Sequence, residues 1–118
     1  MSFAITVTIA DGCPARQRYV FTKPARCLVG RAEDCAIRFP TDMGHSTISR
    51  HHCLLTIKPN GMSVRDLGSL TGTYVNGRPI GQRRPDQPRE AVDPRTFAAR
   101  PLKEGDEVRI GPVTLRVG

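Results

Sequence analysis

The chain has 118 residues, with 18 Lys and Arg against 11 Asp and Glu, so its formal net charge at pH 7 is +7. This length is typical of one domain of about 100–150 residues, and no apolar run approaches the roughly 20 residues of a membrane-spanning helix. Length and composition therefore exclude a membrane-spanning helix, a collagen-like or acidic disordered chain, and a large two-domain enzyme. We expect a single domain over residues 1–118.

Short runs rich in β-branched and aromatic residues recur along the chain, whereas helical periodicity is nearly absent. In the first run, Phe3–Ile9, apolar residues alternate with small or polar ones, which leaves one strand face apolar. Two sheets must pack face to face to bury such faces, so we predict an all-β fold, an antiparallel β-sandwich. The further predicted strands, in chain order, are Arg18–Thr22, Cys27–Val29, Ala36–Phe39, Cys53–Ile57, Met62–Asp66, Gly72–Val75, Glu107–Ile110 and Val113–Val117.

Turn sequences separate several of these runs, at Asp11-Gly12, Pro59-Asn60-Gly61, Asn76-Gly77 and Gly105-Asp106. The most informative of them is Asn76-Gly77, which stands between two apolar runs. Because both residues tolerate positive φ, this dipeptide predicts a tight hairpin.

The segment Arg78–Pro101 breaks the strand pattern, since it holds five of the ten prolines and six arginines. Proline lacks the N–H that a sheet ladder needs, so we predict that the middle of the segment, Gln82–Pro94, is a long loop between two strands, within an Arg/Pro-rich insertion at about 82–101. A short helical turn is expected within Glu90–Arg100. Long loops in compact domains are often functional, and the sequence leaves open whether this one is functional or a plain surface insertion.

The four cysteines, Cys13, Cys27, Cys35 and Cys53, show no C-x-x-C spacing, and three of them stand in apolar surroundings. This pattern favours small buried thiols in a reducing compartment over a disulfide framework. The N-terminus also lacks the basic region and long apolar core of a signal peptide. We therefore expect a cytoplasmic protein.

Four short segments, each at a strand end or a turn, combine the groups that bind an anion. Guanidinium makes paired, charge-assisted hydrogen bonds to phosphate, and loop N–H groups add donors without adding charge. In a sandwich, such positions from several strands can meet at one rim. The segments are Gly30-Arg31, Ser49-Arg50-His51-His52, Asp66-Leu67-Gly68-Ser69 and Gly72–Gly77.

With these segments in this order, the sequence resembles the forkhead-associated (FHA) domain over residues 3–117. The resemblance rests on LVGR-x-x-x-C-x-I-x-F, ISRHHC, VRDLGS-x-x-GTYVNG and LKEGDEVRIG. It implies two packed sheets of about 11 short strands that bind a phosphothreonine-containing protein or peptide, without a cofactor or metal. The ISRHH form and the long insertion are similar to bacterial members linked to serine/threonine kinases, so a cognate kinase is a further expected partner.

The resemblance implies a role for each matching residue. Arg31 and Ser49 correspond to a phosphate-binding arginine and serine, and Arg50 to a further phosphate contact. Ser69 and Leu70 correspond to the second recognition loop, which contacts the peptide. Residues of the remaining group support the site rather than touch the ligand: Gly30, the loop-bracing His52, Gly72 and Asn76.

The sequence departs from the family pattern at Thr71, where the family commonly has an Asn that holds the peptide backbone. A hydroxyl offers fewer hydrogen bonds than an amide and has a shorter reach. We expect phosphate capture to persist through Arg31 and Ser49, and the contact of residue 71 with the peptide backbone to be weakened by about one hydrogen bond, on the order of 1 kcal/mol.

Other chemistries find little support in the sequence. Ser49, His51 or His52, and Asp66 supply the residue types of a hydrolase triad, but no G-x-S-x-G elbow is present. A zinc site that combines His45, His51 or His52 with Cys53 lacks ligand spacing, and no phosphate-binding GxxxxGK[ST] loop occurs. We expect a binding module, not an enzyme.

Two other binding functions remain open from the sequence. The net charge of +7 suits nucleic acid, although the few aromatic residues fall mostly within strand patterns and leave few platforms on which bases could stack. Thr71 raises the second possibility, a degenerate, phosphate-independent docking scaffold. The phosphorylated partner, its preferred flanking residues and the oligomeric state are not encoded in any pattern we can identify.

Overall fold

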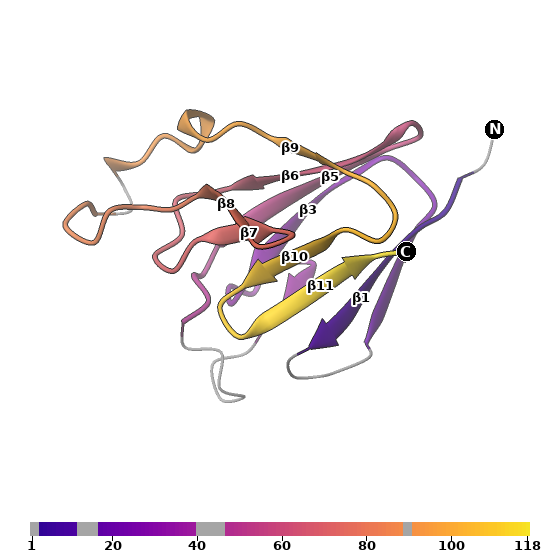
Figure 1. Ribbon diagram of the computed structural model, residues 1–118, viewed down its shortest axis with the longest axis horizontal. Coiled ribbons are helices and arrows are strands. Elements are labelled where there is room, and N and C mark those ends of the chain that lie inside the picture. The colour runs from indigo at the N-terminus through magenta and orange to yellow at the C-terminus, as the bar shows by residue number, and fades with distance from the viewer. Residues whose placement is uncertain (1–2, 12–16, 40–46, 89–90) are drawn as a thin grey trace.

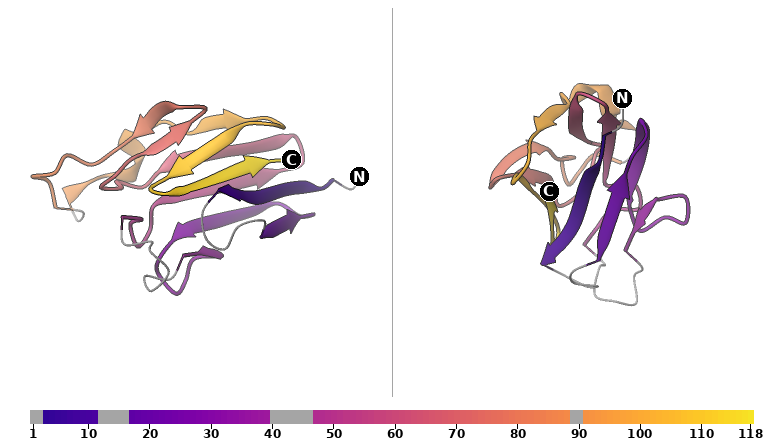
Figure 2. Two further views of the ribbon diagram at one scale, coloured as in Figure 1. Left: turned by 60° about the horizontal axis from the view of Figure 1, so that its bottom comes forward. Right: turned by 90° about the vertical axis from the view of Figure 1, so that its right-hand side faces the viewer.

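In the computed structural model, which describes residues 3–11, 17–39, 47–88 and 91–118, the chain forms two packed β-sheets (Figure 1). Figure 2 shows the same sheets from two further directions. The six-stranded sheet has the order β2 (Arg18–Phe21), β1 (Ile5–Asp11), β11 (Val113–Val117), β10 (Glu107–Ile110), β7 (Thr73–Val75) and β8 (Arg78–Gly81). The five-stranded sheet has the order β4 (Ile37–Arg38), β3 (Ala25–Gly30), β5 (Cys53–Lys58), β6 (Gly61–Asp66) and β9 (Arg100–Leu102).

This architecture confirms the predicted all-β sandwich, with eleven strands among the described residues. Pairing between them is antiparallel with one exception, because β3 and β4 run parallel with Val29 opposite Ile37. Cys27, Cys35 and Cys53 are buried thiols, as predicted, whereas Cys13 lies outside the described residues. No helix in the described part of the chain is long and apolar enough to span a membrane.

The core forms where the apolar faces of the two sheets meet. In β5, for example, Cys53, Leu55 and Ile57 are buried while the intervening Leu54 and Thr56 are partly exposed. Burying an aliphatic side chain of this size contributes about 1.5–3 kcal/mol. The same period-two alternation recurs on β11, so both sheets contribute buried side chains to one core.

The loop predicted for Gln82–Pro94 lies between two strands, as expected, whereas the end of the insertion predicted at about 82–101 belongs to a strand. Residues 78–81 form β8, the edge strand of the six-stranded sheet, and residues 100–102 form β9, the edge strand of the other. Edge strands tolerate Pro79 and Pro101 because one side of an edge strand needs no ladder hydrogen bonds. Between them lies the short 3-10 helix η3 (Pro94–Thr96), within the range where a helical turn was expected.

The predicted Asn76-Gly77 hairpin joins β7 to β8. Both turn residues have positive φ, 50° for Asn76 and 82° for Gly77, and Val75 pairs with Arg78 across the turn. This is the backbone geometry that matches the right-handed twist of two paired strands.

The loops that carry the candidate motifs lie together at one end of the sandwich. Residues 47–52, 67–72 and 82–88 connect strands at the end opposite to both termini (Figure 1). At the other end, the backbone of Gly118 exchanges hydrogen bonds of 2.7 and 3.0 Å with Thr6, which closes β1 against β11. The sandwich thus presents three sequence-distant loops at one rim.

Candidate functional site

A hollow of about 320 Å³ lies between two of these loops and the start of the Arg/Pro-rich segment. Its wall contains three guanidinium groups and three side-chain hydroxyls but no acidic side chain among the described residues, so it favours an anion. The lining residues are Arg31, Thr47, Ile48, Ser49, Arg50, Leu70, Thr71 and Arg83.

Arg31 enters this hollow directly after β3 ends. Its backbone N–H donates to the carbonyl of Ser49 at 3.2 Å, and its Nε donates to the carbonyl of Ile48. These bonds tie the root and the middle of the side chain to the neighbouring loop. The guanidinium is therefore held at the wall of the hollow.

Gly30 makes this attachment sterically possible. A Cβ at residue 30 would lie 2.1 Å from the carbonyl oxygen of Arg50, far inside van der Waals contact. Immediately beyond, the N–H of Ala32 donates to that same carbonyl at 3.0 Å. The supporting role expected for Gly30 thus has a definite origin, the close approach of two backbones.

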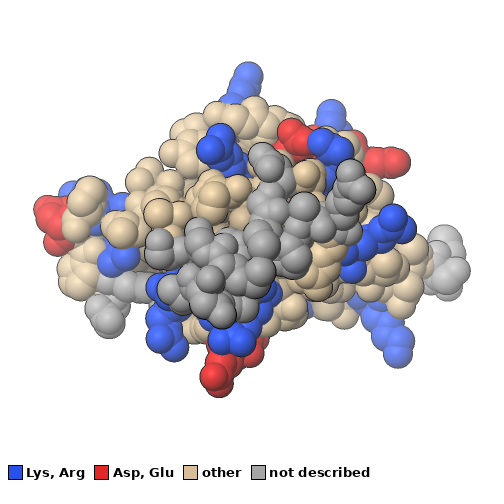
Figure 3. All heavy atoms as spheres, turned by 90° about the horizontal axis from the view of Figure 1, so that it is seen from below, with Lys and Arg blue, Asp and Glu red and all other residues tan. Residues whose placement is uncertain are grey.

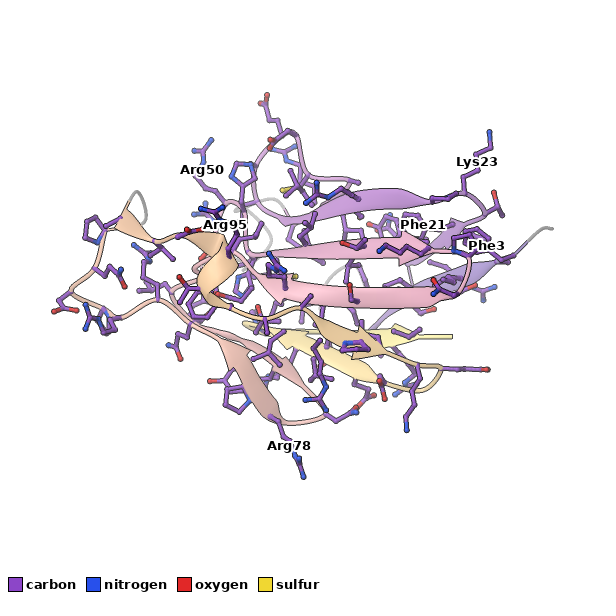
Figure 4. All side chains as sticks on the ribbon, turned by 90° about the horizontal axis from the view of Figure 1, so that it is seen from above. Phe3, Phe21, Lys23, Arg50, Arg78 and Arg95 are labelled. Atoms are coloured by element: carbon purple, nitrogen blue, oxygen red, sulfur yellow. The ribbon has the colours of Figure 1, made fainter. Side chains whose placement is uncertain are left out.

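Ser49 connects two loops of the site. Its half-buried Oγ accepts a hydrogen bond of 3.1 Å from the N–H of Leu70. A hydroxyl that accepts one bond still has a proton to donate, so Ser49 can bind a ligand oxygen while it holds the second loop. Arg50 follows it with an exposed side chain that projects from this end of the molecule, whereas Arg78 points away on another side (Figure 4).

His52 braces the loops from beneath and is fully buried. Its Nδ1 accepts from the N–H of Ser49 at 3.0 Å, and its Nε2 lies 2.9 Å from the carbonyl of Gly72. The neutral ring with its proton on Nε2 satisfies both partners. Burial lowers the pKa of His52, and the opposing influence of the Gly72 carbonyl and Asp66 is smaller.

Asp66 organises the loop that follows β6, a role that the sequence analysis missed. One carboxylate oxygen accepts from the N–H groups of Gly68 and Ser69 at 2.9 and 3.0 Å. The other accepts from the hydroxyls of Ser69 and Thr73 at 2.5 and 2.6 Å. An Asp at a strand end, followed by Gly-Ser and then Thr, is the sequence signal that could have indicated this side-chain-to-backbone turn.

The predicted peptide-contact residues do not all face the hollow. Ser69 is fully buried, because its hydroxyl donates to Asp66 and accepts from the N–H of Gly72 at 3.0 Å. Its side chain therefore shapes the loop and does not line the hollow. Leu70 is 47% exposed, and Thr71 donates its hydroxyl to the carbonyl of Thr47 at 2.9 Å.

Gly72 and Asn76 occupy positions with special backbone geometry. Gly72 has φ of 91°, which disfavours any side chain there. Asn76 accepts from the N–H of Glu107 at 2.9 Å and donates to Asp106 at 3.0 Å, which fixes the β7–β8 turn on β10. This second bond, together with the Lys103 N–H, lowers the pKa of Asp106.

A second depression of about 600 Å³ begins at Thr71 and runs over β7, β10 and β11. Its floor combines the ring of Tyr74 with the charged side chains of Glu107 and Arg109. Thr71 lines both this depression and the smaller hollow. A peptide that occupies the hollow can therefore continue along the outer face of the six-stranded sheet.

Asp34, Cys35 and His51 bring three possible metal ligands within 4.8 Å of one another. They are already engaged, since His51 Nε2 lies 2.7 Å from Asp34 and Cys35 donates to the Arg50 carbonyl at 3.3 Å. Arg38 and Arg50 line the same depression. A divalent ion there would have to displace these contacts against nearby positive charge.

Lys and Arg side chains are dispersed over the face of the molecule that Figure 3 shows. Figure 3 shows them in separate groups around one face, interrupted by neutral and acidic side chains. Several of the arginines also have acidic partners, as Arg116 does with Glu107 at 2.6 Å. The visible charge therefore does not form the continuous stripe expected of a nucleic-acid track.

Comparisons with known proteins identify the family of this chain. The sequence matches the family described as FHA domain over residues 27–111. It is 35% identical over 94 residues to the glycogen accumulation regulator GarA of Mycobacterium tuberculosis, covering 77% of this chain and 48% of that protein. It is 30% identical over 120 residues to the oxoglutarate dehydrogenase inhibitor of Corynebacterium efficiens, covering 95% and 72%. This chain thus spans about half the length of GarA.

Among solved structures, the fold is similar to the FhaA FHA domain complexed with the intracellular domain of Rv3910. The TM-score is 0.71, with 23% identity over 97% of this chain and 99% of that one. A structure from a study of phosphothreonine-dependent FHA domain interactions gives the same TM-score of 0.71 at 22% identity, over 98% and 95% of the two chains. At these identities the likeness concerns the fold.

Replacing Gly30 by Ala should loosen the attachment between β3 and the 48–52 loop. The added Cβ would meet the Arg50 carbonyl, and relieving such an overlap costs about 1–3 kcal/mol. We expect a lower melting temperature and faster hydrogen exchange at the amides of Arg31 and Ala32. Gly118→Ala, where the added Cβ meets open space, is the control, and equal behaviour of both variants would contradict this account.

The stability of the folded protein should fall as the pH drops below about 6.5, the ordinary pKa of histidine. Because burial lowers the pKa of His52 in the fold, the unfolded chain takes up its proton first, and protonation favours unfolding. Urea titrations between about pH 7 and pH 5 measure this loss. In His52→Gln the overall stability should be lower and this part of the pH dependence should vanish; an unchanged pH dependence would assign it to other groups.

Proposed function

This chain belongs to the FHA domain family, and we propose that it is a phosphothreonine-dependent protein-binding module. Its role would be to recruit phosphorylated partners, a cognate serine/threonine kinase among them. The observation that carries the proposal is the convergence of Arg31, Ser49 and Arg50 on one hollow that has no acidic side chain among its described lining residues.

The chemistry of the hollow matches a phosphorylated threonine. A phosphate group carries a charge of about −1.5 to −2 at neutral pH. The guanidinium groups of Arg31 and Arg50 supply two positive charges, and the Ser49 hydroxyl supplies a neutral donor. Leu70, 47% exposed at the edge of the hollow, offers an apolar surface for the threonine methyl group.

The same geometry supports a binding role without catalysis. A serine nucleophile needs a base within hydrogen-bond reach of its hydroxyl. Here the Nδ1 of His52 accepts from the backbone N–H of Ser49, and the Ser49 hydroxyl faces the N–H of Leu70. Asp66 is bonded to Ser69 and Thr73 instead of a histidine. A hydrolase would need hydrogen bonds from the Ser49 hydroxyl to His52 and from His52 to Asp66, and neither bond is present among these side chains.

We further propose that residues 1–118 form one domain acting in the cytoplasm, as a part of a larger signalling protein. The buried thiols of Cys27 and Cys53 support a reducing compartment, and burial raises their pKa, to about 11 for Cys27. Such thiols are protonated and unreactive at neutral pH. The share of GarA that the chain covers, 48%, supports the larger context.

A phosphate-independent docking scaffold is the second candidate, favoured by one observation. Thr71 stands where the family commonly has an Asn, and its hydroxyl is already bonded to the Thr47 carbonyl. A Thr71 hydroxyl that is already bonded to the neighbouring loop has less capacity to hold a peptide backbone. Titration with a phosphothreonine peptide and its unphosphorylated twin separates the two functions, and random DNA at varied salt tests a nucleic-acid role.

Replacing Arg31 by Ala should weaken binding of a phosphothreonine peptide at least about tenfold, since a charge-assisted hydrogen bond contributes about 1.5–3 kcal/mol. Isothermal titration calorimetry measures the change. Arg78→Ala, which removes the same charge from an exposed position that points away from the site (Figure 4), should leave the affinity nearly unchanged. Equal losses in the two variants would assign binding to overall charge rather than to the hollow.

Replacing Thr71 by Asn should strengthen phosphopeptide binding by roughly threefold to tenfold, the effect of about one added hydrogen bond. The longer amide can keep the Thr47 carbonyl as a partner and still present its oxygen to a peptide. Thr71→Val, which only removes the bond to Thr47, should bring no gain. Weaker binding by the Asn variant would mean that the Thr71–Thr47 contact itself forms the bound shape of the loop.

A further inference from the structure

We propose that Arg83, from the Arg/Pro-rich segment 82–101, binds a second anionic group of the phosphorylated ligand. The module would then select a phosphothreonine accompanied, within a few residues, by a carboxylate or another phosphate. This inference rests on the proposed function and adds a selectivity to it. It also makes the segment 82–101 a working part of the site.

The start of the segment is fastened onto the recognition loop. The N–H of Arg83 donates to the carbonyl of Ser69 at 2.7 Å, and the side-chain amide of Gln82 donates to the carbonyl of Leu70 at 2.8 Å. These contacts occupy two consecutive carbonyls of the loop that lines the hollow. Arg83 therefore forms part of the wall of the hollow, and Gln82 attaches it to the recognition loop.

The next residues hold the Arg83 side chain in place. A turn closes where the N–H of Gln87 donates to the carbonyl of Arg84 at 3.0 Å, and Nη1 of Arg83 donates to the carbonyl of Gln87 at 3.1 Å. The guanidinium is thereby clamped between the recognition loop and this turn. A clamped guanidinium loses less freedom when it binds a ligand than an extended surface arginine does.

The far part of the segment packs behind the same loop. Val92 lies against Gly68, where an added Cβ would come within 2.9 Å of a Val92 methyl carbon. Phe97 lies equally close to Gly81, at 2.9 Å from the position of an added Cβ. Val92 thus packs on the recognition loop, and Phe97 packs on β8 beside it. These contacts attach the segment to the site.

Arg83 keeps donors for a ligand. Its Nε is buried and has no acceptor among the described residues, and Nη1 is the one guanidinium nitrogen with a partner in that part of the chain. Because Arg83 lines the hollow and its Nη2 has no partner among the described residues, the guanidinium can donate to an anionic oxygen there. Arg95, further along the segment, differs because Asp93 already binds it at 2.9 Å.

The charge of the hollow points to a second anion. Arg31 and Arg50 on one wall match the charge of about −1.5 to −2 on a single phosphate. Arg83 stands beside Leu70 and Thr71 on the recognition-loop side and adds a third positive charge, with no acidic side chain among the described lining residues. A ligand with one phosphate leaves this charge unmatched, whereas a neighbouring carboxylate or phosphate complements it.

The test uses peptides of one sequence that differ in charge. The first is a phosphothreonine peptide with neutral flanks. One series adds a Glu at each nearby position in turn, and a second series adds a second phosphothreonine in the same way. The last peptide is the unphosphorylated form of the neutral-flank peptide. The wild-type protein should bind one of the doubly anionic peptides about tenfold more tightly than the neutral one, the scale of one charge-assisted hydrogen bond. Which of the two gains identifies the anion as carboxylate or phosphate.

Arg83→Gln should remove this gain, and it should weaken binding of the doubly anionic peptide several-fold more than binding of the neutral-flank phosphopeptide. Arg84→Gln is the matched control, because it removes the same charge at the next residue. The Arg84 side chain is 77% exposed and lies outside the hollow. The control should keep the gain. Arg83→Lys, which keeps the charge and loses the planar fork, should keep only part of it.

Three results would overturn the inference: no gain from a second anion, equal loss of the gain in Arg83→Gln and Arg84→Gln, or equal weakening of all phosphopeptides by Arg83→Gln. If Arg83→Gln weakens all phosphopeptides equally, its thermal unfolding shows the cause. A lower melting temperature means a folding defect, and an unchanged one means that Arg83 contacts the first phosphate. Both causes contradict a second-anion role. The proposed function is tested separately, since it fails only if the wild-type protein does not prefer the neutral-flank phosphopeptide over its unphosphorylated form.

Discussion

The carboxylate of Asp66 is the group on which the shape of the binding end depends. A charge buried this completely is stable only when hydrogen bonds replace its water, and Asp66 obtains four, from two backbone N–H groups and two hydroxyls. Satisfying them forces the chain after β6 into a tight loop. Within that loop the next N–H, that of Leu70, arrives at the hydroxyl of Ser49. One buried charge therefore sets the position at which two loops meet.

His52 provides the second connection between the same loops, and it does so as a neutral ring. Its two nitrogens join the N–H of Ser49 to the carbonyl of Gly72. Since burial holds its pKa down, the brace adds no positive charge of its own to the site. Attraction for an anion is thus left to Arg31, Arg50 and Arg83, while Asp66 and His52 fix where the ligand-binding groups stand.

Sequence patterns predicted the features that neighbouring residues determine. They did not predict the features that depend on contacts between residues distant in the sequence. Alternation along Phe3–Ile9 and the Asn76-Gly77 pair predicted a sandwich and a hairpin, because strand faces and positive φ are properties of neighbouring residues. The convergence of Arg31 with Ser49 followed from a family resemblance. Nothing adjacent to Arg83 indicates that its N–H meets the Ser69 carbonyl, and the buried position of Ser69 depends on Asp66 in the same way.

The preformed state of the hollow has a consequence for affinity. Ordering a loop during binding costs free energy, about 0.5–1.5 kcal/mol for each immobilised side chain with many rotamers. Here the hydrogen bonds of Ser49, Thr71 and Arg83 to other loops are made before any ligand arrives. At Thr71 this rigidity reduces the capacity to bind a peptide. The hydroxyl that donates to the Thr47 carbonyl is the group that would otherwise reach the peptide backbone. The Thr71–Thr47 bond therefore gives order to the loop and occupies the hydroxyl. In the proposed function, the arginines on either wall would then contribute more of the recognition.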